Sequence, residues 1–183
     1  MRRWQAAPFL YPGMMNGGEE ELHLLETPRL VLRHFLMEDA KEIRLLSGEK
    51  AYRRWLPDQV YATLQEAEGV LEYLISRYEG KELPYVLAIE EKKTGSLIGH
   101  VGVSSIAQGL EIGYAIGRCH QNRGYATEAV EAFSDWAKQI FASDRLFGLV
   151  RTENYPSRRV LEKAGFWRVE GKENPADSIL YAK

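Results

Sequence analysis

The segment QNRGYAT, at positions 121–127, combines residue types that bind anions. It follows a strand-like run that ends at Gly117 and precedes an amphipathic run that begins near Gly124, so it spans the start of a predicted helix. The first N–H groups of a helix have no partner within the helix, and the helix dipole favours a negative charge beside them. Arg118 and Arg123 add two positive charges. The segment is therefore either an anion-binding turn or an ordinary helix start with solvated arginines.

Composition narrows the classes of partner. The net charge is −2, with 24 Lys and Arg against 26 Asp and Glu, which lacks the basic excess of a protein whose main partner is nucleic acid. The single cysteine, Cys119, cannot form an internal disulfide, and the four histidines show no metal-ligand spacing. No window approaches the roughly 18 apolar residues of a membrane span. We expect a cytoplasmic protein with no metal, no membrane anchor and no direct nucleic-acid contact.

The pattern of apolar residues predicts a flexible arm over residues 1–21 and one domain over residues 22–183. Residues 30–35 alternate as a half-buried strand does, and a capping box at Thr63 and Glu66 opens an amphipathic helix that ends at Gly80. The other predicted strands are 84–91, 95–106, 110–117, 145–152, 166–171 and 177–183, and the other helices cover 38–48, 124–141 and 154–165. Short loops join the second, third and fourth strands as an antiparallel meander. The fold class is α+β, a mainly antiparallel sheet of about seven strands flanked by about four helices.

Several segments, taken in order, resemble a known family. QNRGYA resembles the Q/R-x-x-G-x-G/A loop by which GNAT N-acetyltransferases hold the pyrophosphate of acetyl-CoA. ETPRLVLRHF, LEIGYAI, GYATEAV and NYPSRRVLEKAGF are similar to segments of the RimJ/RimL-type branch, the ribosomal-protein N-acetyltransferases and their relatives. The resemblance extends from about Leu24 to Lys183. It implies the GNAT fold, acetyl-CoA as cosubstrate, direct transfer of the acetyl group to an amine, and compatibility with a homodimer.

The resemblance also implies where acetyl-CoA would lie. The pantetheine arm would run beside the strand that ends at Gly117, with the pyrophosphate on the helix start and the thioester where the fourth and fifth predicted strands part. Ala126 stands where the family usually has a second glycine, a common variant. Asn154 either caps its helix or bonds the pantetheine amide. The implied binding residues are Ile116, Gly117, Arg118, Gln121, Asn122, Arg123, Gly124, Tyr125, Ala126, Thr127, Asn154 and Ser157.

Two residues are candidates for catalysis. Many GNAT enzymes have a tyrosine that protonates the leaving sulfur, but Leu161 occupies that position here, so Ser157 is the candidate acid. Ser157 could equally bond backbone N–H groups in the first turn of its helix. Glu111 is the candidate base, acting through a water molecule on the attacking amine. Alternatively Glu111 only attracts the substrate's cation or is a surface glutamate, and His100 is a second candidate base.

The chemistry of amines favours some acceptors over others. An α-amino group has a pKa of about 7.7–8.0 and a lysine side chain about 10.4, so the neutral lysine costs roughly 3–4 kcal/mol more to form. A peptide N-terminus or small amine is therefore preferred. Trp55, Tyr61 and Tyr85 are weak candidates for lining the acceptor groove, and Cys119 is not expected to carry the acetyl group. The alternatives are an acyl-CoA-binding domain without catalysis, which Leu161 would suit, and a nucleotide-binding protein, whose usual glycine and lysine motifs are missing.

Overall fold

The computed structural model describes residues 23–170 and 177–183, so the predicted arm at 1–21 lies outside the described residues. The strands are β1 His23–Glu26, β2 Leu30–Arg33, β3 Tyr85–Glu91, β4 Ser96–Ile106, β5 Gly109–Ile116, β6 Leu146–Arg151, β7 Trp167–Arg168 and β8 Ser178–Ala182. The α-helices are α1 Ala40–Ser47, α2 Lys50–Trp55, α3 Leu64–Ile75, α4 Tyr125–Ile140 and α5 Tyr155–Lys163. Short 3-10 turns occur at η2 Met37–Asp39, η3 Pro57–Gln59 and η4 Arg118–His120.

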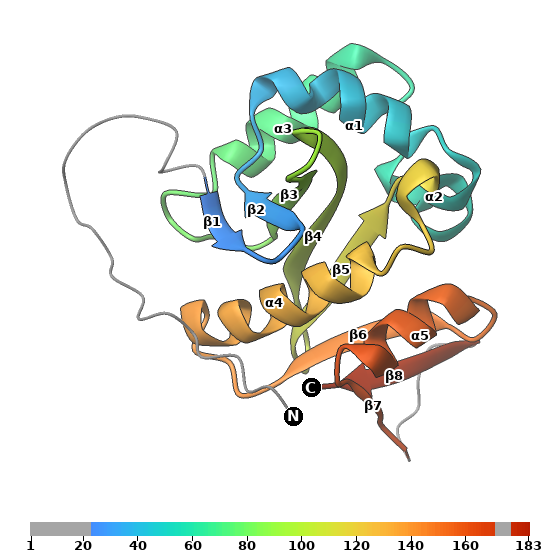
Figure 1. The fold of residues 1–183 in the computed structure, drawn as a ribbon. Coiled ribbons are helices and arrows are strands. Elements are labelled where there is room, and N and C mark those ends of the chain that lie inside the picture. The colour runs from blue at the N-terminus through green and yellow to red at the C-terminus, as the bar shows by residue number, and fades with distance from the viewer. Residues whose placement is uncertain (1–22, 171–176) are drawn as a thin grey trace.

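All eight strands form one mixed sheet, in the order β1-β2-β3-β4-β5-β6-β8-β7. Neighbouring strands are antiparallel except β5 and β6, which are parallel. Figure 1 shows that β5 and β6 lie together at one end and diverge toward the other, where β6, β8 and α5 stand apart from the rest of the sheet. The predicted meander of β3, β4 and β5 is confirmed, and so is the mixed α+β fold.

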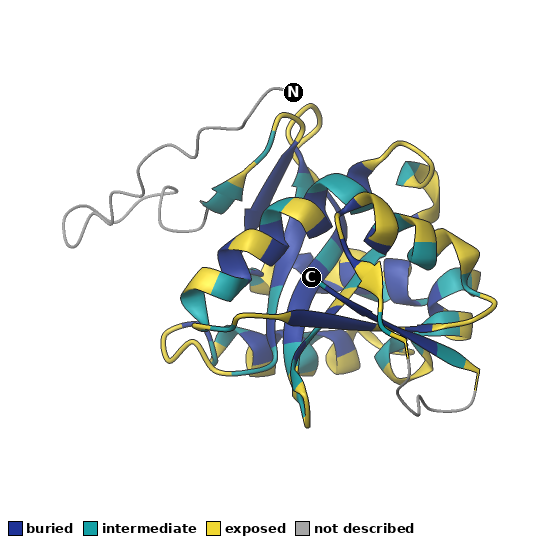
Figure 2. Cartoon of the chain, turned by 90° about the horizontal axis from the view of Figure 1, so that it is seen from below, coloured by how far each residue is buried: buried dark blue, intermediate teal, exposed yellow. Residues whose placement is uncertain are grey.

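Helices cover both faces of the sheet. α4 packs on one face, where Ala129, Val130 and Phe133 join a core that also contains Leu161 of α5. α1 and α3 cover the other face around a second core, which includes Leu71 of α3. Figure 2 shows the buried residues concentrated in the strands and on the inner sides of the helices.

The structure differs from the predicted elements at β1, β2, α2 and the end of α3, and β7 covers only Trp167–Arg168 of the strand predicted at 166–171. The strand at Leu30–Arg33 is buried at every residue, because β1 and β3 flank it and helices cover both faces. β1 and the six-residue helix α2 have no clear pattern in the sequence and were not predicted. The capping box at Thr63 and Glu66 is present, with Thr63 Oγ1 accepting from the Glu66 N–H at 3.2 Å. That helix nevertheless ends at Ile75, and turns rather than helix continue toward Gly80.

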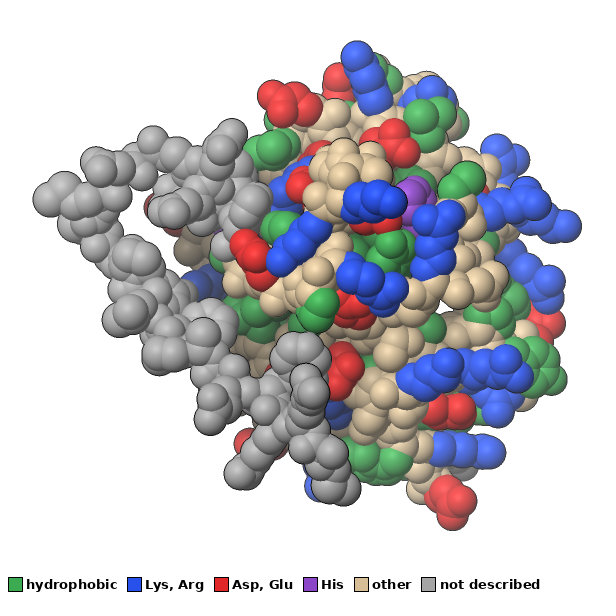
Figure 3. Space-filling view, in the orientation of Figure 1, with side chains coloured by type: hydrophobic (Ala, Val, Ile, Leu, Met, Phe, Trp, Pro, Cys, Tyr) green, Lys and Arg blue, Asp and Glu red, His purple; other side chains and the backbone are tan. Residues whose placement is uncertain are grey.

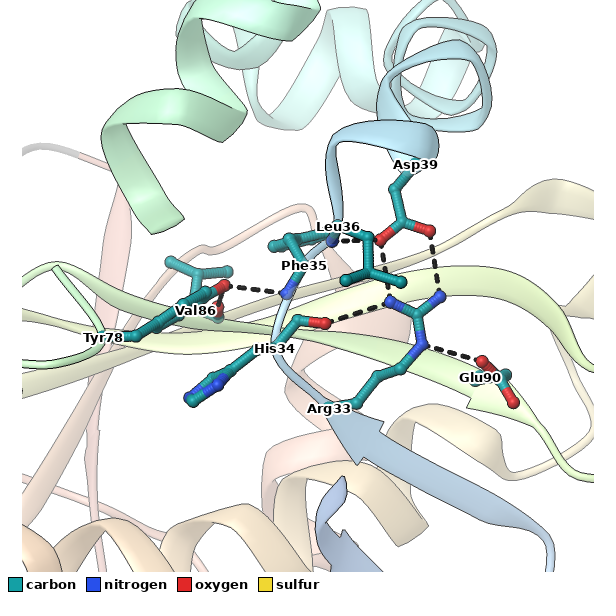
Figure 4. Close-up of polar contacts among 8 residues, drawn as sticks. All are labelled: Arg33, His34, Phe35, Leu36, Asp39, Tyr78, Val86 and Glu90. Carbon is teal, nitrogen blue, oxygen red and sulfur yellow. Dashed lines mark hydrogen bonds and ion pairs between the residues drawn. The ribbon is translucent and has the colours of Figure 1, made fainter. Parts of the chain in front are cut away.

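A buried ion-pair cluster fixes the connection from β2 to α1 (Figure 4). The Arg33 guanidinium donates to both oxygens of Asp39, at 2.8 and 2.9 Å, and to Glu90 at 2.7 Å. Burial alone would lower the pKa of Arg33, but these bonds outweigh it and raise the pKa above its usual value. Beside the cluster, the Tyr78 hydroxyl accepts from the N–H of Phe35 and donates to a carbonyl of β3. The cluster therefore determines where α1 begins and where Phe35 points.

No helix within the described ranges is long and apolar enough to cross a membrane.

Candidate functional site

The divergence of β5 and β6 opens a gap in the sheet. The two strands pair only at Leu110 with Leu146 and at Glu111 with Phe147. On its other edge, β5 pairs with β4 at every residue. The Gly117 N–H donates to the Ile98 carbonyl of β4 at 2.8 Å. Because main-chain groups of successive residues point to opposite edges of a strand, those of Ile112, Tyr114 and Ile116 point toward β6. Because the pairing with β6 ends at Glu111, these main-chain groups point into the gap.

Glu111 lies where the gap begins. Its carboxylate accepts a hydrogen bond from the Leu149 N–H of β6, with a distance of 3.3 Å between Oε1 and N. Burial raises the pKa of Glu111, and this hydrogen bond opposes the shift without cancelling it. The side chain is half-buried, so Glu111 is neither a simple surface residue nor enclosed.

Ser157 faces the gap from the first turn of α5 and contacts Tyr114 of β5. The Tyr114 hydroxyl donates to the Ser157 carbonyl at 2.9 Å and lies 2.8 Å from Ser157 Oγ. Burial raises the pKa of Tyr114 well above its usual value, so the phenol stays protonated at neutral pH. Asn154 supplies the helix cap, with Oδ1 accepting from the Ser157 N–H at 3.3 Å. The Ser157 hydroxyl therefore points to Tyr114, and the side chain that caps α5 is that of Asn154.

The loop from Gly117 to Gly124 connects the open strand to α4. Gly124 is the N-cap of α4 with φ +82°, a left-handed conformation that favours glycine, and no side chain caps this helix start. Asn122 is also left-handed, with φ +60°. Gln121 is exposed, but its Nε2 donates to the Ile116 carbonyl at 2.8 Å and ties the loop to β5. The N–H groups at the start of α4 are thus left for an anion.

Arg29, in the turn between β1 and β2, connects this loop to α4. Its Nη1 donates to the Arg123 carbonyl at 2.8 Å, and its Nε donates to Glu128 of α4 at 2.7 Å. Thr27 also donates to Glu128, at 2.6 Å. Burial opposes ionisation of Glu128, but the bonds from Thr27 and Arg29 outweigh it and lower the pKa of the carboxyl. The ETPRL segment therefore holds the loop in place.

Tyr125 supports the loop from inside the protein. The side chain is buried, and its hydroxyl donates to Glu91 at the end of β3. The bond from Tyr125 and a second from Thr94 lower the pKa of Glu91. Of the predicted binding residues, Tyr125 thus offers the ligand side its main chain and not its hydroxyl.

Positive charge gathers around the loop, although the chain as a whole is slightly acidic. Arg118 and Arg123 of the loop are exposed, as are Arg53 and Arg54 of α2. Figure 3 shows Lys and Arg side chains concentrated on the half of this face where α2, the start of α4 and α5 lie. Acidic groups interrupt them, because Glu49 accepts from the Arg118 N–H at 2.8 Å and Glu153 pairs with Arg54 at 3.1 Å. The surroundings of the loop suit a polyanion.

A cavity of about 240 Å³ lies between α1, α3 and the sheet. We call it the helix-side cavity. Its polar lining residues are Ser47, Tyr52, Gln59, Tyr61, Tyr73, His100 and Ser104, and the others are apolar residues or glycines. Tyr52 Oη lies 3.3 Å from His100 Nδ1, and burial lowers the pKa of His100 to about 4. His100 is therefore neutral at pH 7 and a weak base.

Tyr61, one of the weak groove candidates, lines the helix-side cavity, while the other two lie elsewhere. Trp55 stacks under the Arg54 guanidinium, 4.4 Å from the ring centroid, and Tyr85 is buried against Trp136 in the core. Cys119 is exposed beside the loop, not a buried apolar residue. No group of three or more His, Cys, Asp or Glu within the described residues could hold a metal ion.

Two supporting residues, Tyr114 and Arg29, were not predicted from the sequence. Both belong to segments that carry the family resemblance, LEIGYAI and ETPRLVLRHF, but nothing in the segments indicates their partners. Tyr114 meets a residue 43 positions away, and Arg29 meets one 99 positions away. Tyr114, an aromatic residue in the mostly apolar segment LEIGYAI, carries a signal that could have identified it, whereas Arg29 lies in a segment with several other polar residues and carries none.

Comparison with known proteins identifies the family. A family model described as "Acetyltransferase (GNAT) domain" matches residues 29–167. A probable N-acetyltransferase of Bacillus subtilis (strain 168), YjcK, is 34% identical over 152 residues, which cover 78% of this chain and 83% of the relative.

Solved structures share the fold. The ribosomal-protein-S5-alanine acetyltransferase of Vibrio fischeri has a TM-score of 0.73 at 22% identity, covering 87% of this chain and 94% of that one. The microcin C7 self-immunity acetyltransferase MccE, solved with acetyl-CoA and AMP, has a TM-score of 0.71 at 19% identity, covering 86% and 93%. At these identities the likeness establishes the fold alone. The family model and the curated relative go further, and the chain belongs to the GNAT family of N-acetyltransferases.

Proposed function

We propose that this N-acetyltransferase uses acetyl-CoA as its donor and moves the acetyl group by direct attack of a neutral amine on the thioester. The observation that carries the proposal is the gap between β5 and β6, with Glu111 at its closed end and the Tyr114–Ser157 pair on its wall. The proposed acceptor is the α-amine of a peptide N-terminus or a small amine. The choice of a peptide N-terminus follows from the resemblance to RimJ/RimL-type enzymes.

The open edge of β5 and the loop after it provide a continuous donor site. From Ile112 to Ile116 the strand offers roughly 14 Å of edge, at about 3.4 Å per residue, along which a linear amide chain can bond to main-chain groups other than the Ile116 carbonyl, which Gln121 occupies. The strand leads to the uncapped start of α4, whose N–H groups suit a pyrophosphate. Arg118 and Arg123 add charge there. Bound acetyl-CoA supplies a thioester to the gap.

Glu111 is proposed to assist the amine. An ammonium with a pKa near 8 loses its proton at modest cost, so a carboxylate that acts through one water molecule is sufficient. The raised pKa of Glu111 brings it closer to that of the amine. His100, with its pKa near 4, is the weaker candidate.

Ser157 is proposed to donate the proton that the departing sulfur requires. Leu161, which occupies the usual tyrosine position, is buried in the core and contributes no proton. Tyr114 is a positioning residue, because its hydroxyl holds the Ser157 side chain at 2.8 Å.

Replacement of Ser157 by alanine is expected to lower kcat by about 10²-fold, the lower range for loss of a general acid. The KM for acetyl-CoA should change less than twofold, because Asn154 still caps α5. Tyr114→Phe should give a smaller loss of kcat, and Ser105→Ala, at an exposed position of β4, should give none. Steady-state kinetics with saturating amine measures these effects, and full activity of Ser157→Ala would remove the serine from the mechanism.

The experiment that tests the proposed function is a CoA-release assay from pH 6 to pH 9, with mass spectrometry to locate the acetyl group. We expect amine-dependent release, and stabilisation against heat by acetyl-CoA but not by ATP or NAD, amounting to about 2.7 kcal/mol at one hundred times Kd. Glu111→Gln should lower kcat/KM at least about tenfold, and more at low pH, where little neutral amine is present. Exposed Glu153→Gln is the control. Donor binding without release of CoA in the presence of any amine would contradict the proposal.

A further inference from the structure

The helix-side cavity contains no charged side chain. Among the described residues that line it, none is Asp, Glu, Lys or Arg, and its polar groups are hydroxyls, one amide and one imidazole. Burial keeps the imidazole of His100 neutral at pH 7. The cavity therefore has no counter-ion for a buried ammonium.

Glu111 is the carboxylate that strand pairing places beside the cavity. Ser104 and Gly113 line it, and Ser104 pairs with Glu111 across β4 and β5. Glu111 is therefore one strand away from the lining, at the closed end of the gap. The ammonium group of an acceptor that lies beside Glu111 has this carboxylate as its counter-ion. A second ammonium group on the same acceptor would enter the helix-side cavity, whose lining offers no counter-ion.

The energies separate two classes of acceptor. Burying an unpaired ammonium costs several kcal/mol, even after water penetration and relaxation. Burying an apolar side chain of the size of Leu or Phe gains about 1.5–3 kcal/mol. At about 240 Å³ the cavity is smaller than the roughly 300–1,000 Å³ that hold a whole drug-sized ligand, and its size suits one side chain or aromatic ring.

We infer that the acceptor is a monoamine with one large apolar or aromatic group next to the amine, and that this group occupies the helix-side cavity. The inference rests on the proposed function. The same chemistry is found in a peptide whose first residue is Phe or Leu and in a small arylalkylamine. Polyamines, polycationic antibiotics and peptides that begin with lysine are excluded as good substrates.

The test compares kcat/KM for peptides of one length that begin with Phe, Leu, Lys or Glu, and for phenethylamine and spermidine. We expect the best apolar acceptor to exceed spermidine and the lysine peptide at least tenfold. Preference for the Phe peptide over phenethylamine would identify a protein terminus as the source, and the reverse preference would identify a small molecule. Spermidine or the lysine peptide as the best substrate would overturn this inference and leave the transferase proposal standing. Transfer to no amine, with acetyl-CoA bound, would overturn both.

A charge placed in the cavity gives a second test. Gln59→Glu changes one lining amide to a carboxylate of the same shape and should raise the spermidine to phenethylamine ratio of kcat/KM at least tenfold. The matched control is Gln65→Glu, an exposed residue of α3 outside the lining, which should leave the ratio unchanged. Thermal unfolding confirms that both variants fold. An unchanged ratio in a folded Gln59→Glu enzyme would show that the cavity does not contact the acceptor.

Discussion

Replacing Gly124 by glutamate is expected to raise the KM and Kd for acetyl-CoA by at least 10²-fold. Gly124 has φ +82°, which costs an L-residue about 1–2 kcal/mol, and a Cβ there would lie 3.3 Å from Arg29 Nη2. The new carboxylate would also draw Arg29 away from Glu128 and repel a pyrophosphate beside the helix start. The backbone strain is present with or without the donor, so the weaker binding comes from the added charge and the displaced Arg29, and a hundredfold change equals about 2.7 kcal/mol at about 1.36 kcal/mol per tenfold. Isothermal titration and the CoA-release assay measure the loss.

The control for this substitution is Gly95→Glu. Gly95, in the exposed turn between β3 and β4, has φ +66° and nothing within 4 Å of an added Cβ, so the variant carries a similar backbone strain outside the loop. It should lose some stability and keep its affinity for acetyl-CoA. Equal affinity losses in the two variants, or none in Gly124→Glu, would mean that this loop does not hold the donor.

Replacing Arg33 by methionine is expected to lower the free energy of unfolding by about 3–5 kcal/mol, because two carboxylates would remain without their cation. The side chains of Arg33 and Asp39 are 8% and 9% exposed, so solvent cannot replace the lost bonds. For a chain of this size the melting temperature should fall by about 10 °C. Urea denaturation and calorimetry measure the two quantities.

Arg54→Met is the matched control. It breaks an ion pair with Glu153 in which both side chains are more than half exposed, at 56% and 57%. Such pairs contribute about 0–1 kcal/mol, so its melting temperature should change little. A loss as large as that of Arg33→Met would show that burial of the Arg33 cluster is not what makes it important.

The elements that depend on local sequence were predictable, while those that depend on distant partners were not. The apolar periodicity of α4, the capping box of α3 and the turn signals between β3, β4 and β5 are contained in short segments, and all three agree with the structure. The four residues of β1 carry too little pattern to predict a strand, and the polar Arg33 predicts a half-buried strand where β2 is buried throughout.

The candidate site shows the same division. The sequence located the loop at Gly124 and the candidates Glu111 and Ser157, and their roles remain predictions. It could not show that the Glu111 carboxylate bonds Leu149, or that Tyr114 holds Ser157, because each pair joins strands or helices whose pairing is not local. The helix-side cavity requires three helices and the sheet to be assembled, and no segment of the sequence predicts its lining.

The gap between β5 and β6 also bears on aggregation. Two strand edges with main-chain groups open to pairing lie inside the fold, and such edges invite a strand from another molecule. An inward-pointing charge at an edge is one of the devices that discourage such pairing. Glu111 is such a charge, and its bond to the Leu149 N–H also occupies the first open position on β6. The carboxylate that we propose for proton transfer is therefore also placed to discourage such pairing, and a neutral residue there would leave the opening available to a foreign strand whenever the donor is absent.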